Sequence, residues 1–149
     1  MLDLLTPRYK LPLLAVGQAQ KELFHNEAII LLDYLAQPVV QSLAANPETL
    51  SPGDGDAWIV GASATGEFLG HDGEIALWTG GGWRFILCWQ GMSVLREDLQ
   101  ALAVLTENGW ESQPNIIDPT GGNVIDIEAR TAVASILSAL RAGKLIADI

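Results

Sequence analysis

The chain has 149 residues, and 18 acidic side chains against eight Lys and Arg give it a formal net charge of −10. Hydrophobic residues at 49% and charged residues at 17% exclude a largely disordered chain, and the acidic balance argues against nucleic-acid binding through a broad basic face. The single cysteine, Cys88, excludes an internal disulfide framework and a zinc site made of cysteines alone.

No secretory or membrane-spanning signal is expected. The longest apolar run near the N-terminus extends only from Leu13 to Val16, which is shorter than the core of a signal peptide. No run approaches the roughly 18 apolar residues of a membrane-spanning helix, and the acidic charge argues against a polybasic membrane anchor. We therefore expect a protein that is made and folded in the cytoplasm, without membrane insertion.

The N-terminal segment, residues 1–43, predicts one helix from Gln18 to Gln37. Apolar side chains recur there at steps of four, three and four residues, which is one stripe of a helix: Phe24, Ala28, Leu31 and Leu35. Pro38 ends or kinks this helix. Residues 44–55 are dense in Pro, Gly, Asn and Asp, and they predict a linker.

Residues 56–112 hold all five tryptophans and predict a β module. Short β runs alternate there with turn-forming residues: Asp56–Gly61, Glu74–Thr79, Trp83–Trp89, Met92–Leu95 and Ala101–Thr106. In the third run, Trp, Phe, Leu and Trp alternate with more polar or smaller residues, so one face is strongly aromatic. We expect a small antiparallel sheet or barrel of about five strands.

The C-terminal segment, residues 113–149, begins with turn-forming residues and ends in a predicted helix. Asp126 is a favourable N-cap, the helix runs to Ala142, and Gly143 suits its C-cap. Its apolar positions form a seam: Ala129, Val133, Ile136, Leu137 and Leu140. Because an isolated helix of this length is marginal in water, it needs the β module, the first helix or copies of itself to pack against. We expect an α+β fold in which this last helix oligomerises.

The densest polar cluster lies at the start of the first predicted helix: Gln18, Gln20, Lys21, Glu22, His25, Asn26 and Glu27. A glutamate and a histidine three residues apart can hold a metal or form an acid–base pair. No second histidine lies nearby, so the alternative is a polar helix face with local pairs or with hydrogen bonds to another subunit. We expect no metal site here.

A second candidate group is His71 and Asp72, in a glycine-rich connection near Ser63 and Thr65. A histidine–aspartate pair beside a hydroxyl suggests a hydrolase, but a triad depends on geometry that spacing does not specify. The chain has no G-x-S-x-G elbow. A histidine in a turn is the simpler interpretation, and we expect no catalytic residue.

The tryptophans suggest a third kind of site. Exposed indoles stack on sugar rings, and acidic side chains accept hydrogen bonds from sugar hydroxyls. The alternative is that the tryptophans fill the core of a small sheet, since they bury a large area. The candidate ligand-binding residues are Trp78, Trp83, His71 and Asp72.

Several sequence blocks between about residues 10 and 90 resemble a known family. These blocks are Leu11-Pro12-Leu13-Leu14, Gly17-Gln18-Ala19-Gln20-Lys21-Glu22, His25-Asn26-Glu27-Ala28, Leu32-Asp33, Gly55-Asp56-Ala57-Trp58-Ile59-Val60-Gly61, Thr65-Gly66, Gly70-His71-Asp72-Gly73-Glu74-Ile75-Ala76 and Gly82-Trp83-Arg84-Phe85. They are similar to an uncharacterised family encoded in prophages and gene transfer agents. Its members resemble parts of tail fibres or tail-associated proteins, and the family has no established enzymatic activity.

The C-terminal segment carries a second resemblance. Residues 118–122 (Asp-Pro-Thr-Gly-Gly) and the helix that follows resemble the short C-terminal helices of phage fibre proteins, which help those proteins to trimerise. The two resemblances imply a non-enzymatic structural or attachment component of a phage-like tail, as a fibre or fibre base. The implied assembly is a homotrimer without cofactor, located in the tail of the particle, and its partners are other tail proteins and a host surface glycan.

Two alternatives stay open from the residues themselves. One is a carbohydrate-binding module that uses exposed tryptophans. The other is a hydrolase or metal enzyme that uses His25, Glu22, His71 or Asp72.

Overall fold

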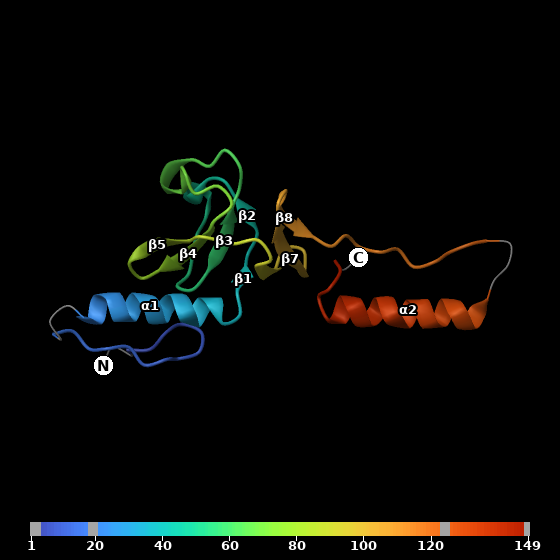
Figure 1. The fold of residues 1–149 in the computed structure, drawn as a ribbon, viewed down its shortest axis with the longest axis horizontal. Helices are drawn as coiled ribbons and strands as arrows, with labels where there is room; N and C mark the ends of the chain where they lie inside the picture. Colours follow the sequence, from blue (N-terminus) through green and yellow to red (C-terminus); the bar gives the residue numbers. More distant parts are fainter. Residues whose placement is uncertain (1–3, 18–20, 123–125, 148–149) are drawn as a thin grey trace. The chain divides into compact units, whose positions relative to one another are not determined.

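Figure 1 shows the computed structural model of the chain, which describes residues 4–17, 21–122 and 126–147. The chain divides into two compact units, Met1–Leu87 and Cys88–Ile149. Each unit contains one α-helix and several strands.

The first unit is built around a four-stranded sheet in the order β2-β3-β4-β5. Strands β3, β4 and β5 are antiparallel to one another, whereas β2 pairs with β3 in parallel. The elements of this unit, in chain order, are α1 (Lys21–Leu35), β1 (Val39–Val40), β2 (Leu43–Ala44), the 3-10 helix η1 (Pro47–Thr49), β3 (Ala57–Val60), the 3-10 helix η2 (Gly66–Phe68), β4 (Ile75–Thr79) and β5 (Gly82–Ile86).

One face of this sheet carries an aromatic core. Side chains alternate between the two faces of a strand, so the register Ala76↔Phe85 and Trp78↔Trp83 places these four residues on the same face. The ring of Phe68, from η2, meets the Trp83 ring edge to face at 4.9 Å. Phe68 belongs to a buried cluster, and Trp83 is among the partly buried residues packed against it. The cluster is Val60, Ala64, Phe68 and Ala76, and its partly buried neighbours are Ala44, Leu50, Trp83 and Phe85.

The opposite face of the sheet carries Leu77 and Arg84, and α1 runs along this side of the unit in Figure 1. The Arg84 Nε donates to Glu27 Oε1 of α1 at 2.6 Å. This ion pair therefore connects the helix to the β4–β5 hairpin.

The N-terminal residues fold back on themselves beside α1. Leu5 and Pro12 form an antiparallel bridge, and the Leu13 N–H donates to the Leu4 carbonyl at 2.7 Å. Residues 4–13 therefore form a short irregular hairpin, called here the N-terminal hairpin.

The second unit contains three antiparallel strands and the helix α2. Its elements are β6 (Ser93–Arg96), β7 (Ala101–Thr106), β8 (Gly109–Ser112) and α2 (Ile127–Ala142). The Asp126 side chain caps α2 by accepting from the Ala129 N–H at 2.9 Å. The chain beyond α2 returns to the strands, because the Leu102 N–H donates to the Lys144 carbonyl at 2.9 Å.

The predicted α+β fold with one helix near each end is confirmed, but its β structure differs from the prediction. The strands form two sheets, and the described residues contain no closed barrel. The predicted strand Trp83–Trp89 is too long: β5 ends at Ile86, which pairs with Ile75 at the start of β4, so no residue of β4 remains to extend the ladder. Beyond it, Leu87 and Trp89 are 60% and 72% exposed.

The predicted segment boundaries can also be placed in the structure. The division into two units falls inside residues 56–112, which were predicted as one β module. The predicted linker, residues 44–55, contains the end of β2 and the whole of η1. Helix α1 begins at Lys21, whereas the predicted start at Gln18 lies outside the described residues.

Helix α1 turns its polar side inward and its apolar stripe outward. Glu22, Asp33 and Tyr34 are its buried residues. With 3.6 residues per turn, the predicted stripe lies opposite Glu22 and Asp33, and Phe24 within that stripe is 80% exposed. The periodicity therefore predicts the helix correctly, but the fold of the single chain leaves much of its apolar stripe in contact with solvent.

Candidate functional site

Trp78 of β4 and Trp83 of β5 lie directly opposite each other. The Trp78 N–H donates to the Asp56 carbonyl and its carbonyl accepts from the Gly55 N–H, at 2.8 and 2.9 Å. Both backbone groups of Trp78 therefore point away from β5, which makes the tryptophans a non-hydrogen-bonded pair with closely spaced side chains. Their ring centroids are 4.9 Å apart at an angle of 72°.

The two indoles line a groove of about 390 Å³, here called the tryptophan groove. Its other walls come from η1 and the residues after it, and from η2. The lining residues are Pro47, Glu48, Leu50, Ser51, Pro52, Glu67, Trp78 and Trp83. A groove of this volume falls within the range of small-molecule sites. It combines an apolar floor with two acidic side chains.

The tryptophan groove carries negative charge that no basic side chain among the described residues of its lining neutralises. Glu48 and Glu67 are exposed, and neither carboxylate has a hydrogen-bond or ion-pair partner among the described residues. The described residues that line the groove include no Lys, Arg or His. The arrangement can therefore stack a flat apolar ligand and attract a positive charge.

The other two predicted ligand residues, His71 and Asp72, lie in the turn before β4 and do not line this groove. The His71 ring stacks on Phe85 with centroids 3.6 Å apart, and its Nδ1 lies 2.8 Å from Glu74 Oε2. The Asp72 carboxylate accepts from backbone N–H groups at residues 63 and 64. In the structure, these contacts hold the turn together.

The polar cluster of α1 is the second candidate region. Gln18 and Gln20 lie outside the described residues, and Lys21 and His25 are exposed. Asn26 uses its whole side-chain amide on Leu14: its Oδ1 accepts from the Leu14 N–H at 2.9 Å, and its Nδ2 donates to the Leu14 carbonyl at 3.0 Å.

The two glutamates of this cluster also make contacts within the first unit. Glu22 accepts from the Gly17 N–H at 3.2 Å, and Glu27 pairs with Arg84. Asn26 and Glu22 therefore hold the chain that precedes α1, and Glu27 holds the β4–β5 hairpin. The described residues contain no group of three or more His, Cys, Asp and Glu side chains placed to share a metal.

Asp33 belongs to the block Leu32-Asp33 of the family resemblance but was not among the candidate site residues, yet it makes the most extensive contacts of α1. Its Oδ1 accepts from Thr6 Oγ1 at 2.6 Å and from the Tyr9 N–H at 2.8 Å, and its Oδ2 accepts from the Arg8 N–H at 3.0 Å. Burial by itself raises the pKa of this carboxyl, but the three hydrogen bonds and the Arg8 charge outweigh it and hold the pKa below its usual value. The sequence feature that could have pointed to a buried Asp33 is an acidic residue inside an apolar helical run, Leu31-Leu32-Asp33.

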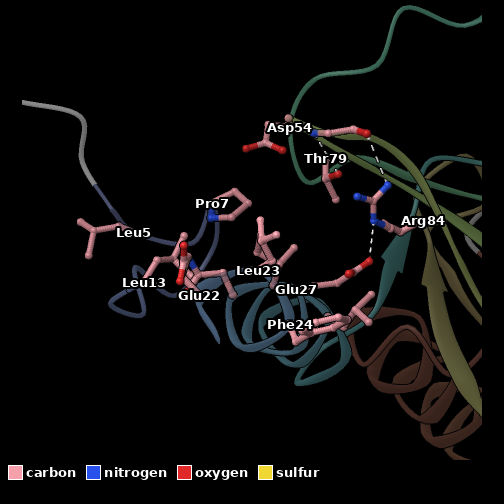
Figure 2. A pocket seen from close by; sticks show the side chains of 15 residues that line it. Leu5, Pro7, Leu13, Glu22, Leu23, Phe24, Glu27, Asp54, Thr79 and Arg84 are labelled. Atoms are coloured by element: carbon pink, nitrogen blue, oxygen red, sulfur yellow. Dashed lines mark hydrogen bonds and ion pairs between the residues drawn. The ribbon is translucent and has the colours of Figure 1, made fainter. Parts of the chain in front are cut away.

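A larger cavity of about 570 Å³ lies between the N-terminal hairpin, α1 and the β4–β5 turn, and is called here the α1 cavity. Figure 2 shows Asp54 and Thr79 across this cavity from Leu23, with Arg84 reaching Glu27. Its lining is mostly apolar and includes Leu5, Pro7, Leu13, Leu23, Phe24, Ile30 and Leu31. The α1 cavity therefore continues the exposed apolar stripe of α1.

The predicted seam of α2 is also open to solvent. Ala129, Val133 and Ile136 are exposed, Ile136 at 58%, and Leu140 is half-buried. Leu137 is the exception within the seam, at 5% exposed. Leu137 therefore belongs to the core of the folded chain, whereas the rest of the seam is available for contacts outside it.

Comparison with known protein families gives one match. The model of the family described as "Protein of unknown function (DUF2793)" matches residues 25–111, which is more than half of the chain. The chain belongs to this family. No curated protein matches the chain.

The DUF2793 segment includes the whole tryptophan groove and most of α1. It ends at Glu111, within β8, so α2 and its seam lie outside it. Neither helix in the described part of the chain has the length and apolar character that crossing a membrane requires.

Proposed function

We propose that this protein is a non-enzymatic structural component of a phage-like tail, a fibre or fibre base, and that it assembles as a homotrimer. The observation that carries the proposal is the open apolar seam of α2, on which Val133 and Ile136 remain exposed in the folded chain. Contiguous exposed apolar surface of this kind marks protein–protein contact sites. The tail location rests on the resemblance of the sequence blocks to tail-associated proteins.

The exposed stripe of α1 supports the same proposal. Phe24 of this stripe is 80% exposed and Leu32, which flanks the stripe, is 58% exposed, on a helix whose inward side is held by polar contacts. Burying such side chains contributes about 1.5–3 kcal/mol each, so the exposed apolar residues of both helices would favour an assembly that covers them.

Light scattering on a sizing column tests the assembly. We expect a mass three times the 16.0 kDa of one chain. The double variant Val133→Asp/Ile136→Asp places charges on the exposed part of the seam and should reduce the mass to that of one chain. The matched control Thr131→Asp/Ser138→Asp adds the same charge on the other side of α2 and should remain trimeric.

Two results would count against this assembly. A monomeric wild-type protein at tens of micromolar would refute the oligomer. A trimer that survives the seam substitutions would show that α2 does not form the interface. The tail location is tested separately by immunogold labelling of purified phage-like particles, where absence of the protein from the particles would refute it.

A second candidate function is carbohydrate binding, and the tryptophan groove favours it. Trp78 and Trp83, both chosen from the sequence, line one groove with two acidic side chains that can accept hydrogen bonds from hydroxyls. Binding on a glycan array, lost in Trp78→Ala while far-UV circular dichroism stays unchanged, would support it. The absence of any glycan signal from the folded wild-type protein would refute it.

A further inference from the structure

We propose that the tryptophan groove binds an amino sugar through its free ammonium group, an inference that rests on the carbohydrate-binding candidate above. The inference goes beyond that candidate because it names the charge of the ligand. It depends on three observations: the apolar platform, the unbalanced carboxylates and the absence of lining cations.

The apolar platform consists of two indoles, two prolines and Leu50. The C–H face of a pyranose ring is flat and apolar, and it suits contact with an indole. Trp83 is surrounded by other rings, at 5.7 Å from Trp58 and 4.9 Å from Phe68. Trp78 contacts no aromatic ring other than Trp83 among the described residues, so Trp78 is the indole that a sugar ring would cover.

The carboxylates of Glu48 and Glu67 supply the charge. Each stands in the first turn of its 3-10 helix, η1 or η2. The short helices η1 and η2 lie against each other, since an added Cβ on Gly66 would meet Pro47 at 3.3 Å. This packing brings the two acidic side chains to the same groove from distant parts of the sequence.

Among the described residues, no Lys, Arg or His lines the groove beside Glu48 and Glu67, and residues 1–87 carry ten acidic and four basic side chains in all. A neutral glycan would leave both carboxylates without a charge partner, and an anionic glycan would be repelled. An ammonium group can pair with the carboxylates, and it is also attracted to the face of an indole.

Other cations fit the groove less well. A calcium ion takes six to eight oxygen ligands, whereas most of this lining is indole, proline and leucine. A lysine side chain has the charge but covers little of a flat aromatic platform. An amino sugar uses both the platform and the carboxylates.

Titration of the full chain, followed by tryptophan fluorescence and calorimetry, tests the inference with three small probes. They are a β-1,4-linked glucosamine trisaccharide, the N-acetylated trisaccharide of the same length, and trilysine as a probe of matched charge. The test variant is Glu48→Gln/Glu67→Gln, in which both changed side chains are exposed. The control variant Glu107→Gln/Glu111→Gln makes the same change of net charge in the second unit, so it measures the contribution of general charge attraction.

We expect the glucosamine trisaccharide to bind in preference to the other two probes. The variant Glu48→Gln/Glu67→Gln loses two exposed charge pairs with the ligand, so its affinity for the glucosamine trisaccharide should fall about tenfold. The affinity of the control variant should change little. Added salt should weaken binding to the wild type more than to the test variant.

Other outcomes would overturn the inference. Equal binding of the N-acetylated trisaccharide, kept in the double glutamine variant but lost in Trp78→Ala, would leave the carbohydrate-binding function and refute the ammonium contact. Equal binding of trilysine, or an equal loss in the control variant, would refute recognition of an amino sugar. If none of the probes binds, the inference fails, and the glycan array then decides the carbohydrate-binding candidate separately.

Discussion

Replacement of Asp33 by asparagine tests how the N-terminal hairpin is held on α1. The carboxylate accepts three hydrogen bonds, from the Thr6 hydroxyl and from the Arg8 and Tyr9 N–H groups. An asparagine has nearly the same shape but only one accepting oxygen, so its NH2 group must face at least one of these donors. Hydrogen bonds to a charged group contribute about 1.5–3 kcal/mol, and an unsatisfied buried donor costs about 1–3 kcal/mol. We expect the free energy of unfolding of the first unit to fall by about 3 kcal/mol.

The same substitution should change how stability depends on pH. The pKa of Asp33 is lowered in the folded chain, so its contribution is fully present above the pKa of the unfolded chain, near 3.8, and is lost as the pH falls through the lower pKa of the folded chain. The wild type should therefore lose its advantage over Asp33→Asn as the pH falls below about 4. The two proteins should differ most at neutral pH.

Urea unfolding followed by circular dichroism measures the free energy, and hydrogen exchange of the N-terminal hairpin reports local opening. Asp54→Asn is the matched control, since Asp54 is exposed and has no hydrogen-bond partner among the described residues. If Asp33→Asn lost less than about 0.5 kcal/mol, the limit for ordinary surface substitutions, and left the exchange of the hairpin unchanged, the reasoning about this buried carboxylate would be refuted.

Three further substitutions examine other contacts. Asn26→Ala removes both hydrogen bonds to Leu14 and should speed amide exchange at Leu14 about tenfold, a loss of about 1.4 kcal/mol; unchanged exchange would contradict this. Asp126→Ala removes the N-cap of α2 and should lower the stability of the second unit by about 1 kcal/mol, measured by thermal denaturation, whereas an unchanged melting temperature would show that the cap contributes nothing. Glu27→Gln breaks the partly exposed pair with Arg84 and should cost less than about 1 kcal/mol; a larger loss, or one insensitive to salt, would be inconsistent with a solvent-screened pair.

The features that the sequence predicts well are local ones. Asp126 caps α2 as expected because a cap depends only on the next three residues. The N–H of Gly143 likewise bonds to the Ala139 carbonyl at the end of the helix. Strands β4 and β5 also overlap the predicted runs Glu74–Thr79 and Trp83–Trp89, because alternation and turn residues are read within a few positions of the chain.

The features that the sequence does not predict depend on contacts between distant segments. The burial of Asp33 depends on donors 24 to 27 residues earlier in the chain, and periodicity alone favours burial of the apolar stripe instead. Glu48 and Glu67 line the same groove because η1 packs on η2, and the sequence does not specify that packing. Strands as short as β2 carry no pattern that identifies their parallel pairing with β3.

The position of Arg84 has a consequence for the way copies of this protein can join. Strand β5 is the last strand in its sheet, and the Trp83 carbonyl points away from β4 toward the open edge. The Arg84 Nη1 covers that carbonyl at 3.0 Å while its Nε holds Glu27. A foreign strand would have to displace the guanidinium before it could extend the sheet at this point. The guanidinium therefore shields this point of the sheet edge from pairing with a strand of another chain.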